Sequence, residues 1–182
     1  MVPKSVSERL RQSIRTIADF PKPGIMFRDI TTLLQNPEAF SLALTTMQEL
    51  ALPLRPQQII GTESRGFIFA APLALKLQAG FVPVRKPGKL PAATISVTYE
   101  LEYGTDELEI HTDAIRAGER VLLVDDLLAT GGTIRATCNL VEQLGGVVVG
   151  CIFLVELDFL QGRRRLEGFP VYSLVNYESE ND

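Results

Sequence analysis

Two segments in the first third of the chain carry apolar residues at helical spacing. In residues 5–20, apolar side chains recur every three or four positions, and two prolines follow directly. Residues 37–52 repeat the pattern, with proline at the first position and further prolines just beyond the end. Proline is accepted in the first turn of a helix but disrupts its interior. The sequence therefore predicts amphipathic helices over both segments. In the first helix, the apolar face would consist of Val6, Leu10, Ile14 and Ile17.

Three short apolar runs bounded by turn residues follow, at residues 57–64, 81–85 and 120–126. The stretches between the first two runs and after the third have helical length and pattern. Strands that alternate with helices of this length are joined by right-handed crossovers into a mostly parallel sheet covered on both faces. The fold class expected from the pattern is therefore α/β.

One region departs from this alternation. Residues 93–103 and 105–112 alternate apolar with polar side chains on either side of Gly104, which predicts a two-stranded antiparallel ribbon. We expect this ribbon to carry little apolar area and to be mobile. The final residues, 177–182, are acidic, and we expect them to fray.

Composition and charge narrow the class of protein to which the chain can belong. The 182 residues are 46% hydrophobic and 22% charged, which fits one globular domain over residues 1–182. A net charge of −4 argues against binding to a nucleic-acid backbone. No apolar run reaches the length of a membrane span, and the N-terminal residues alternate charge with apolar positions instead of presenting the apolar segment of an export signal. Cys138 and Cys151 have no metal-ligand spacing, so we expect buried thiols and a cytoplasmic protein.

The segment with the clearest chemistry is RVLLVDDLLATGGT, residues 120–133. Its apolar strand ends in Asp125 and Asp126, at the strand end where open α/β sheets bind ligands and where carboxylates can accept hydrogen bonds from sugar hydroxyls. Small residues then lead into a helix N-terminus, which favours a phosphate. The pattern predicts a ribose 5-phosphate site, although a capped turn with close glycine packing is the alternative. The residues of the phosphate cradle are Ala129, Thr130, Gly131, Gly132 and Thr133.

The segment VLLVDDLLATGGT resembles the signature of type I phosphoribosyltransferases, and it lacks the GK[ST] and GxGxxG patterns of other phosphate loops. Other segments resemble, in order and spacing, the members that use adenine: 20–31, 61–74, 85–91, 99–114 and 154–166. The resemblance implies a Rossmann-like core with a small hood at about 20–36 and a lid formed by the ribbon at about 94–113. It also implies transfer of the phosphoribosyl group of phosphoribosyl pyrophosphate (PRPP) to N9 of adenine in purine salvage, by a homodimer.

The resemblance also assigns the pyrophosphate site. It implies pyrophosphate contacts from residues 64–65 and from the turn at 85–89, and a cis peptide bond between Glu63 and Ser64. It also implies that Arg85 can contact the active site of a neighbouring subunit. Mg²⁺ is the expected cofactor, held mainly by PRPP and water because no cluster of metal-ligating residues is apparent. The pyrophosphate residues are Ser64, Arg65, Arg85, Lys86 and Lys89.

For the base, the resemblance implies stacking on Phe27, hydrogen bonds from the main chain of Ile25 and Arg28, and Leu157 on the other face. At the lid tip it implies catalytic roles for Glu102 and Tyr103 beside Arg65, with a merely charged turn as the alternative for Glu102. Two other functions stay open: transfer to hypoxanthine, guanine or orotate, and a regulator that senses PRPP while binding nucleic acid. The acidic net charge disfavours the regulator.

Overall fold

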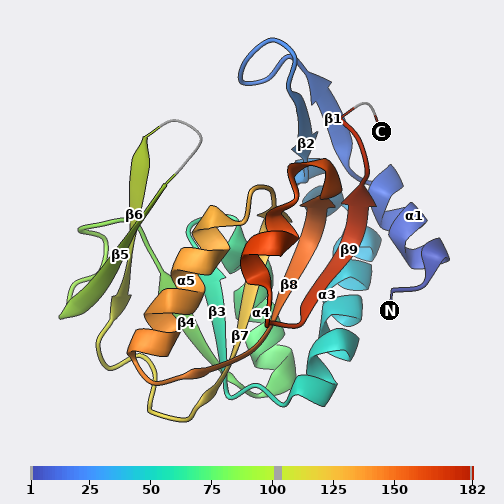
Figure 1. Ribbon diagram of the computed structural model, residues 1–182. Coiled ribbons are helices and arrows are strands. Elements are labelled where there is room, and N and C mark those ends of the chain that lie inside the picture. Colours follow the sequence, from blue (N-terminus) through green and yellow to red (C-terminus); the bar gives the residue numbers. More distant parts are fainter. Residues whose placement is uncertain (1, 101–103, 181) are drawn as a thin grey trace.

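A five-stranded parallel sheet forms the centre of the computed structural model, which describes residues 2–100, 104–180 and 182 (Figure 1). The strand order is β4-β3-β7-β8-β9, and every neighbouring pair is parallel. The predicted α/β class and all three predicted strands are therefore confirmed. The strands are β3 (Gln58–Thr62), β4 (Gly80–Val84), β7 (Arg120–Leu128), β8 (Val147–Leu157) and β9 (Val171–Tyr177).

Helices cover both faces of this sheet, as expected for parallel strands. Leu122 and Val124 of β7 face a core formed with α3 (Pro37–Ala51) and α4 (Gly66–Leu77). Their neighbours Val121 and Leu123 face a second core, formed with α5 (Gly132–Gln143). The prediction of a helix at 37–52 is confirmed to within one residue. In the part of the chain that the structure describes, no helix is long and apolar enough to cross a membrane.

The prediction of one helix over residues 5–20 is wrong after its first half. Helix α1 spans Lys4–Gln12, and β1 (Arg15–Ala18) then pairs antiparallel with β2 (Met26–Asp29). The Ser13 hydroxyl donates to the Arg9 carbonyl at the helix end. Ile17 lies opposite Phe27 in the hairpin. The β-branched residues Thr16 and Ile17 favour a strand over a longer helix because a helix restricts their χ1 angles and a strand packs their branched side chains well. The helix α2 (Thr31–Gln35) and the short turn η1 (Leu52–Leu54) complete this half of the chain.

The ribbon is present as β5 (Thr94–Glu100) and β6 (Thr105–His111), which pair antiparallel beside α5 (Figure 1). The expectation that it carries little apolar area is wrong. Leu108 and Ile110 of β6 are fully buried in the core shared with α5. Alternation gives one face of a ribbon to the core, and α5 is close enough to cover that face.

Described residues of the acidic tail, 177–180 and 182, make contacts with the hood that the expectation of fraying does not include. The Asp182 carboxylate accepts hydrogen bonds from the backbone N–H groups of Glu178 and Ser179. Arg28 of β2 donates to the Glu180 carbonyl at 2.6 Å and lies 4.1 Å over the Tyr177 ring. Cationic side chains from the first part of the chain thus supply partners that the tail sequence alone does not reveal. Two short turns precede β9, namely η2 (Asp158–Leu160) and η3 (Gly162–Leu166).

Candidate active site

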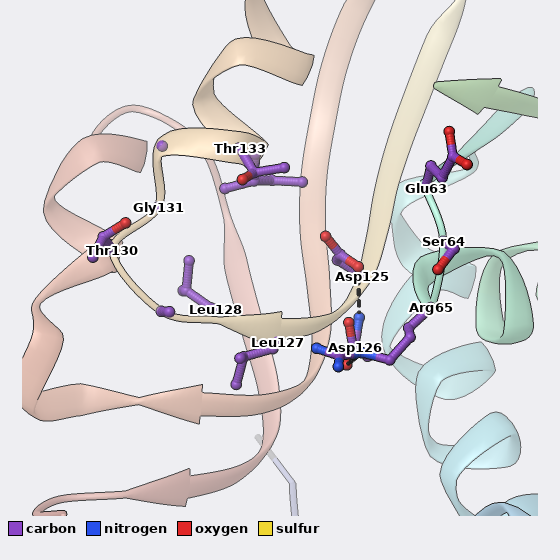
Figure 2. Close-up of a pocket in the computed structure, with 13 residues that line it drawn as sticks. Glu63, Ser64, Arg65, Asp125, Asp126, Leu127, Leu128, Thr130, Gly131 and Thr133 are labelled. Atoms are coloured by element: carbon purple, nitrogen blue, oxygen red, sulfur yellow. Dashed lines mark hydrogen bonds and ion pairs between the residues drawn. The ribbon is translucent and has the colours of Figure 1, made fainter. Parts of the chain in front are cut away.

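The candidate site lies where the chain changes direction within the sheet. From β3 the chain crosses to β4 on one side, and β7 adds on the other side. The loops after β3 and β7 therefore separate and leave a crevice, the usual ligand position in such sheets. A cleft of about 430 Å³ occupies it (Figure 2). We call this cleft the phosphate cleft. Its lining consists of Glu63, Ser64, Arg65 and the continuous run 125–134.

The phosphate cradle forms the wall at the start of α5. Gly131 has φ +80°, and a Cβ there would lie 2.4 Å from the Gly162 carbonyl oxygen. Only glycine allows both this backbone conformation and this close approach. No side chain caps the N-terminus of α5, so its N–H groups suit an anionic ligand. The loop that follows β7 therefore has the geometry expected of a phosphate site.

The acid pair forms the floor of the cleft at the end of β7. Asp126 is 6% exposed and accepts a hydrogen bond from Arg65 Nε to Oδ2 at 2.6 Å. The Asp126 N–H donates to Asp125 Oδ1. Burial, reinforced by the neighbouring Asp126 carboxylate, raises the pKa of Asp125 well above its usual value. The floor thus offers one carboxylate paired with a cation and a second acid whose pKa is raised.

The basic turn, residues 85–91, lies beside the cleft and is held there by Glu63. Arg85 Nη2 donates to Glu63 Oε1 at 3.1 Å, and the Lys86 N–H donates to Glu63 Oε2 at 2.9 Å. Lys89 Nζ lies 3.6 Å from the same carboxylate. These contacts, the Lys86 N–H first among them, lower the pKa of Glu63. The Glu63–Ser64 peptide bond is cis, as the family resemblance implies.

A second, mostly apolar cavity of about 350 Å³ lies between the hood and Arg65. Phe27 meets Phe20 edge to face, with ring centroids 5.1 Å apart, and the Arg65 guanidinium lies 5.8 Å from the Phe27 ring. Arg65 lines both this apolar cavity and the phosphate cleft. A flat, weakly polar group could therefore lie next to a bound sugar phosphate. The lining consists of Ile17, Phe20, Phe27, Arg28, Asp29, Ile30, Thr31 and Arg65.

The structure separates some of the residues predicted to bind the base. Phe27 and Arg28 line the apolar cavity. Ile25 and Leu157 are not part of that lining. Ile25 is 39% exposed, and Leu157 lies half-buried at the end of β8. Glu102 and Tyr103 lie outside the described residues. Sequence reasoning missed Phe20, although an aromatic residue beside a proline-rich turn offered a signal.

The carboxylates of the phosphate cleft are its candidate metal ligands. Among residues 2–100, 104–180 and 182, no group of three or more His, Cys, Asp or Glu side chains could hold a metal ion. Asp125 and Asp126 are the acids at the floor, where Mg²⁺ could take oxygen ligands chiefly from a bound polyphosphate and water. These residues fit a magnesium ion that arrives with an anionic substrate.

The fold and site define an enzyme class that binds a ribose phosphate at the carboxyl edge of a parallel sheet. Residues 30–179 match the phosphoribosyl transferase domain, and the chain belongs to the type I phosphoribosyltransferase family. It is 58% identical to the adenine phosphoribosyltransferase of Desulfitobacterium hafniense, over 90% of this chain and 95% of that protein. The adenine phosphoribosyltransferase of Thermoanaerobacter pseudethanolicus superimposes with a TM-score of 0.91 at 54% identity, over 93% and 99% of the two chains.

A ligand-bound relative has the same fold. The adenine phosphoribosyltransferase of Saccharomyces cerevisiae, in complex with adenine and D-2,5-dideoxy-2,5-imino-altritol 1,6-bisphosphate, superimposes with a TM-score of 0.88. It is 42% identical, and the match covers 94% of this chain and 99% of that one.

Proposed function

We propose that this chain is an adenine phosphoribosyltransferase, which forms AMP and pyrophosphate from adenine and PRPP in purine salvage. The observation that carries the proposal is the position of Arg65, which forms a wall of both the phosphate cleft and the apolar cavity. A base in the apolar cavity would lie beside a ribose in the cleft. Relatives of this length and identity that use adenine support the choice of base.

The phosphate cleft would bind PRPP along its length. The α5 N-terminus and the cradle residues 129–133 would hold the 5-phosphate, since bare N–H groups and the helix dipole favour an anion. Asp125 and Asp126 would accept hydrogen bonds from the ribose hydroxyls. At the other end, cations and the backbone at Ser64 would bind pyrophosphate. These cations are Arg65, Arg85, Lys86 and Lys89.

In the reaction, N9 of adenine forms a bond to C1 of the ribose while the bond from C1 to the pyrophosphate oxygen breaks. Positive charge develops on the ribose ring and negative charge on the leaving pyrophosphate. Mg²⁺, bound with PRPP, would neutralise part of the charge on the leaving group. Arg65 and the basic turn stabilise the remaining charge. Glu102 is proposed to accept the N9 proton, and Tyr103 to approach the pyrophosphate.

Base selection would depend on main-chain groups of the hood. Phe27 offers a ring face to the purine, Leu157 would close the opposite face, and the main chain of Ile25 and Arg28 would pair with the 6-amino edge. The Arg28 side chain is held by Thr16 at 2.8 Å and by the Glu180 carbonyl, which fixes the strand that carries these groups. A 6-oxo purine would place its acceptor against a carbonyl, at a cost of about 1–3 kcal/mol.

The ribbon at 94–113 and the hood at 20–36 are proposed to enclose the substrates. PRPP is an activated ribose, and water that reached C1 would hydrolyse it. A closed ribbon would exclude this water during transfer.

A homodimer is also proposed, with an interface near the basic turn. Leu75 on α4 is 82% exposed, and Ile68 on α4 and Phe81 on β4 are each more than one third exposed. These apolar side chains lie on the elements that precede the basic turn, so a second copy that covers them would also approach Arg85. Sedimentation is expected to give twice the monomer mass, and a fully active monomer would refute the dimer.

We place the enzyme in the cytoplasm. Cys138 and Cys151 are both buried and unpaired, as expected where thiols stay reduced.

The test of the proposed function is product formation by the purified chain. With adenine, PRPP and magnesium chloride, equal amounts of AMP and pyrophosphate are expected by chromatography. Omitting adenine should abolish both products, and a reaction that yields no AMP would refute the proposal.

A further inference from the structure

We propose that Tyr99, on the inner face of the ribbon, is a positioning residue that couples the phosphate cradle to the basic turn. The inference rests on the proposed function, because it assumes that PRPP occupies both ends of the cleft. Tyr99 does not line the phosphate cleft, and its hydroxyl instead connects two groups that would contact the substrate.

The connection runs through one hydroxyl and one carboxylate. The Tyr99 hydroxyl donates to Asp106 Oδ2 at 3.1 Å and accepts a hydrogen bond from Thr133 Oγ1 at 3.4 Å. The Lys86 ammonium forms an ion pair with the same Asp106 oxygen. Asp106 Oδ1 in turn accepts the Glu107 N–H at 2.8 Å. A continuous chain of hydrogen bonds therefore joins the first turn of α5 to the basic turn by way of the ribbon.

The tyrosine is held firmly enough to act in this way. Its ring packs against the core shared by α5 and β6, which contains the fully buried Leu108 and Ile110. Burial raises the pKa of Tyr99, so near neutral pH the hydroxyl keeps the proton that it donates to Asp106. The anchored ring thus fixes where Asp106, and with it Lys86, can lie.

Such positioning matters because Lys86 carries its charge on a long, flexible stem. Ordering a lysine side chain costs rotamer entropy. A network that orders Lys86 and Thr133 beforehand spares PRPP that cost, since both ends of the substrate meet groups already in place. Adenine binds elsewhere and gains nothing from the network. The coupling should therefore appear in PRPP affinity alone.

Tyr99→Phe is the sharpest variant, because it removes one hydroxyl and leaves the charge of the site unchanged. Loss of its hydrogen bonds is expected to raise the KM for PRPP about threefold to tenfold, with the KM for adenine unchanged. Tyr172→Phe makes the same chemical change on β9, at the opposite edge of the sheet from β4, and should alter neither KM. Thermal unfolding of both variants should show that each remains folded.

Two further measurements separate coupling from a purely structural role. Calorimetry with ribose 5-phosphate and with magnesium pyrophosphate should show weaker binding of each probe to Tyr99→Phe. In an Asp106→Asn background, the effect of Tyr99→Phe on PRPP should shrink to less than twofold, because the two residues act through one network. An unchanged KM for PRPP in Tyr99→Phe, an equal rise in the KM for adenine, or full additivity with Asp106→Asn would overturn the inference. If the unaltered protein formed no AMP, the proposed function itself would fail instead.

Discussion

Arg65 and Asp126 lie 61 residues apart in the sequence, yet Arg65 Nε donates to Asp126 Oδ2 at 2.6 Å (Figure 2). Arg65 comes from the loop after β3, and Asp126 from the end of β7. The pair joins the two loops that separate at the carboxyl edge of the sheet. Because Arg65 also lines the apolar cavity, this contact sets the distance between the proposed sites for sugar and base.

Asp126→Asn is expected to lower kcat/KM about 10-fold to 100-fold for every base that the enzyme accepts. The substitution removes a charged acceptor for the ribose hydroxyls and leaves the half-exposed Arg65 side chain without its carboxylate partner. Steady-state kinetics with PRPP as the varied substrate tests this. A loss confined to adenine would contradict the assignment of Asp126 to the sugar.

Phe27→Ala should weaken the use of adenine and leave the binding of PRPP nearly unchanged, in contrast to Asp126→Asn. Loss of the ring that faces the apolar cavity is expected to raise the KM for adenine at least about tenfold, since aromatic contacts contribute beyond their buried area. Calorimetric binding of PRPP should change less than twofold. Equal losses for adenine and PRPP would show that Phe27 supports the fold of the site as a whole.

Gly131→Ala tests the close approach in the phosphate cradle. The added Cβ would lie 2.4 Å from the Gly162 carbonyl oxygen in a backbone with φ +80°, so the loop must move. We expect at least about 2 kcal/mol of lost stability and at least a tenfold loss of ribose 5-phosphate affinity.

Gly118→Ala provides the matched control for this substitution. Gly118 also has φ +80°, but a Cβ there would meet nothing within 4 Å. It should lose only about 1 kcal/mol of stability, through backbone strain, and should bind ribose 5-phosphate normally. Equal losses of affinity in the two variants would contradict a specific role for the Gly131 contact.

Asp29→Asn gives a pH-dependent effect on the stability of the hood. Hydrogen bonds from Thr31, followed by those from Arg15, lower the pKa of Asp29 to about 2. A carboxyl whose pKa is lowered on folding stabilises the protein at pH values above about 3.8, its ordinary pKa in the unfolded chain. This contribution disappears as the pH falls towards 2, the pKa of Asp29 in the folded protein.

Denaturant unfolding should therefore show Asp29→Asn destabilised by roughly 1–2 kcal/mol at pH 7, after allowance for solvent screening. The difference should narrow between pH 4 and pH 2. Asp113→Asn, at an exposed acid outside the hood, is the control for loss of one acidic side chain. A constant difference across this pH range would contradict the role of the ionised carboxylate.

The predictable parts of this structure are those that local sequence determines. Short apolar runs mark β3 and β7 because strands inside a covered parallel sheet are buried on both faces. The edge strand β4 keeps an apolar run in which Val82 and Val84 are buried and Phe81 is exposed. The run from Asp125 to Thr133 marks the cradle because acids, small residues and a helix start occur in one fixed order.

The features that were missed depend on pairings between distant segments. Helical spacing in residues 13–18 competes with a hairpin whose partner, Met26–Asp29, begins only after a proline-rich turn. The buried Glu156 is paired with Arg163 and Ser173, and no local pattern announces that network. The packing of Leu108 under α5 likewise depends on where the helix lies rather than on the ribbon sequence.

The most direct test of the account is pyrophosphate release from PRPP and magnesium, measured in parallel with adenine, hypoxanthine, guanine and orotate. The proposed fit of the apolar cavity to a 6-amino purine predicts release with adenine and at least about a fivefold lower kcat/KM with the other three bases, the factor that corresponds to about 1 kcal/mol. Comparable release with any of those bases would contradict the assignment of the hood as an adenine site, and no release with any base would contradict the proposed enzyme.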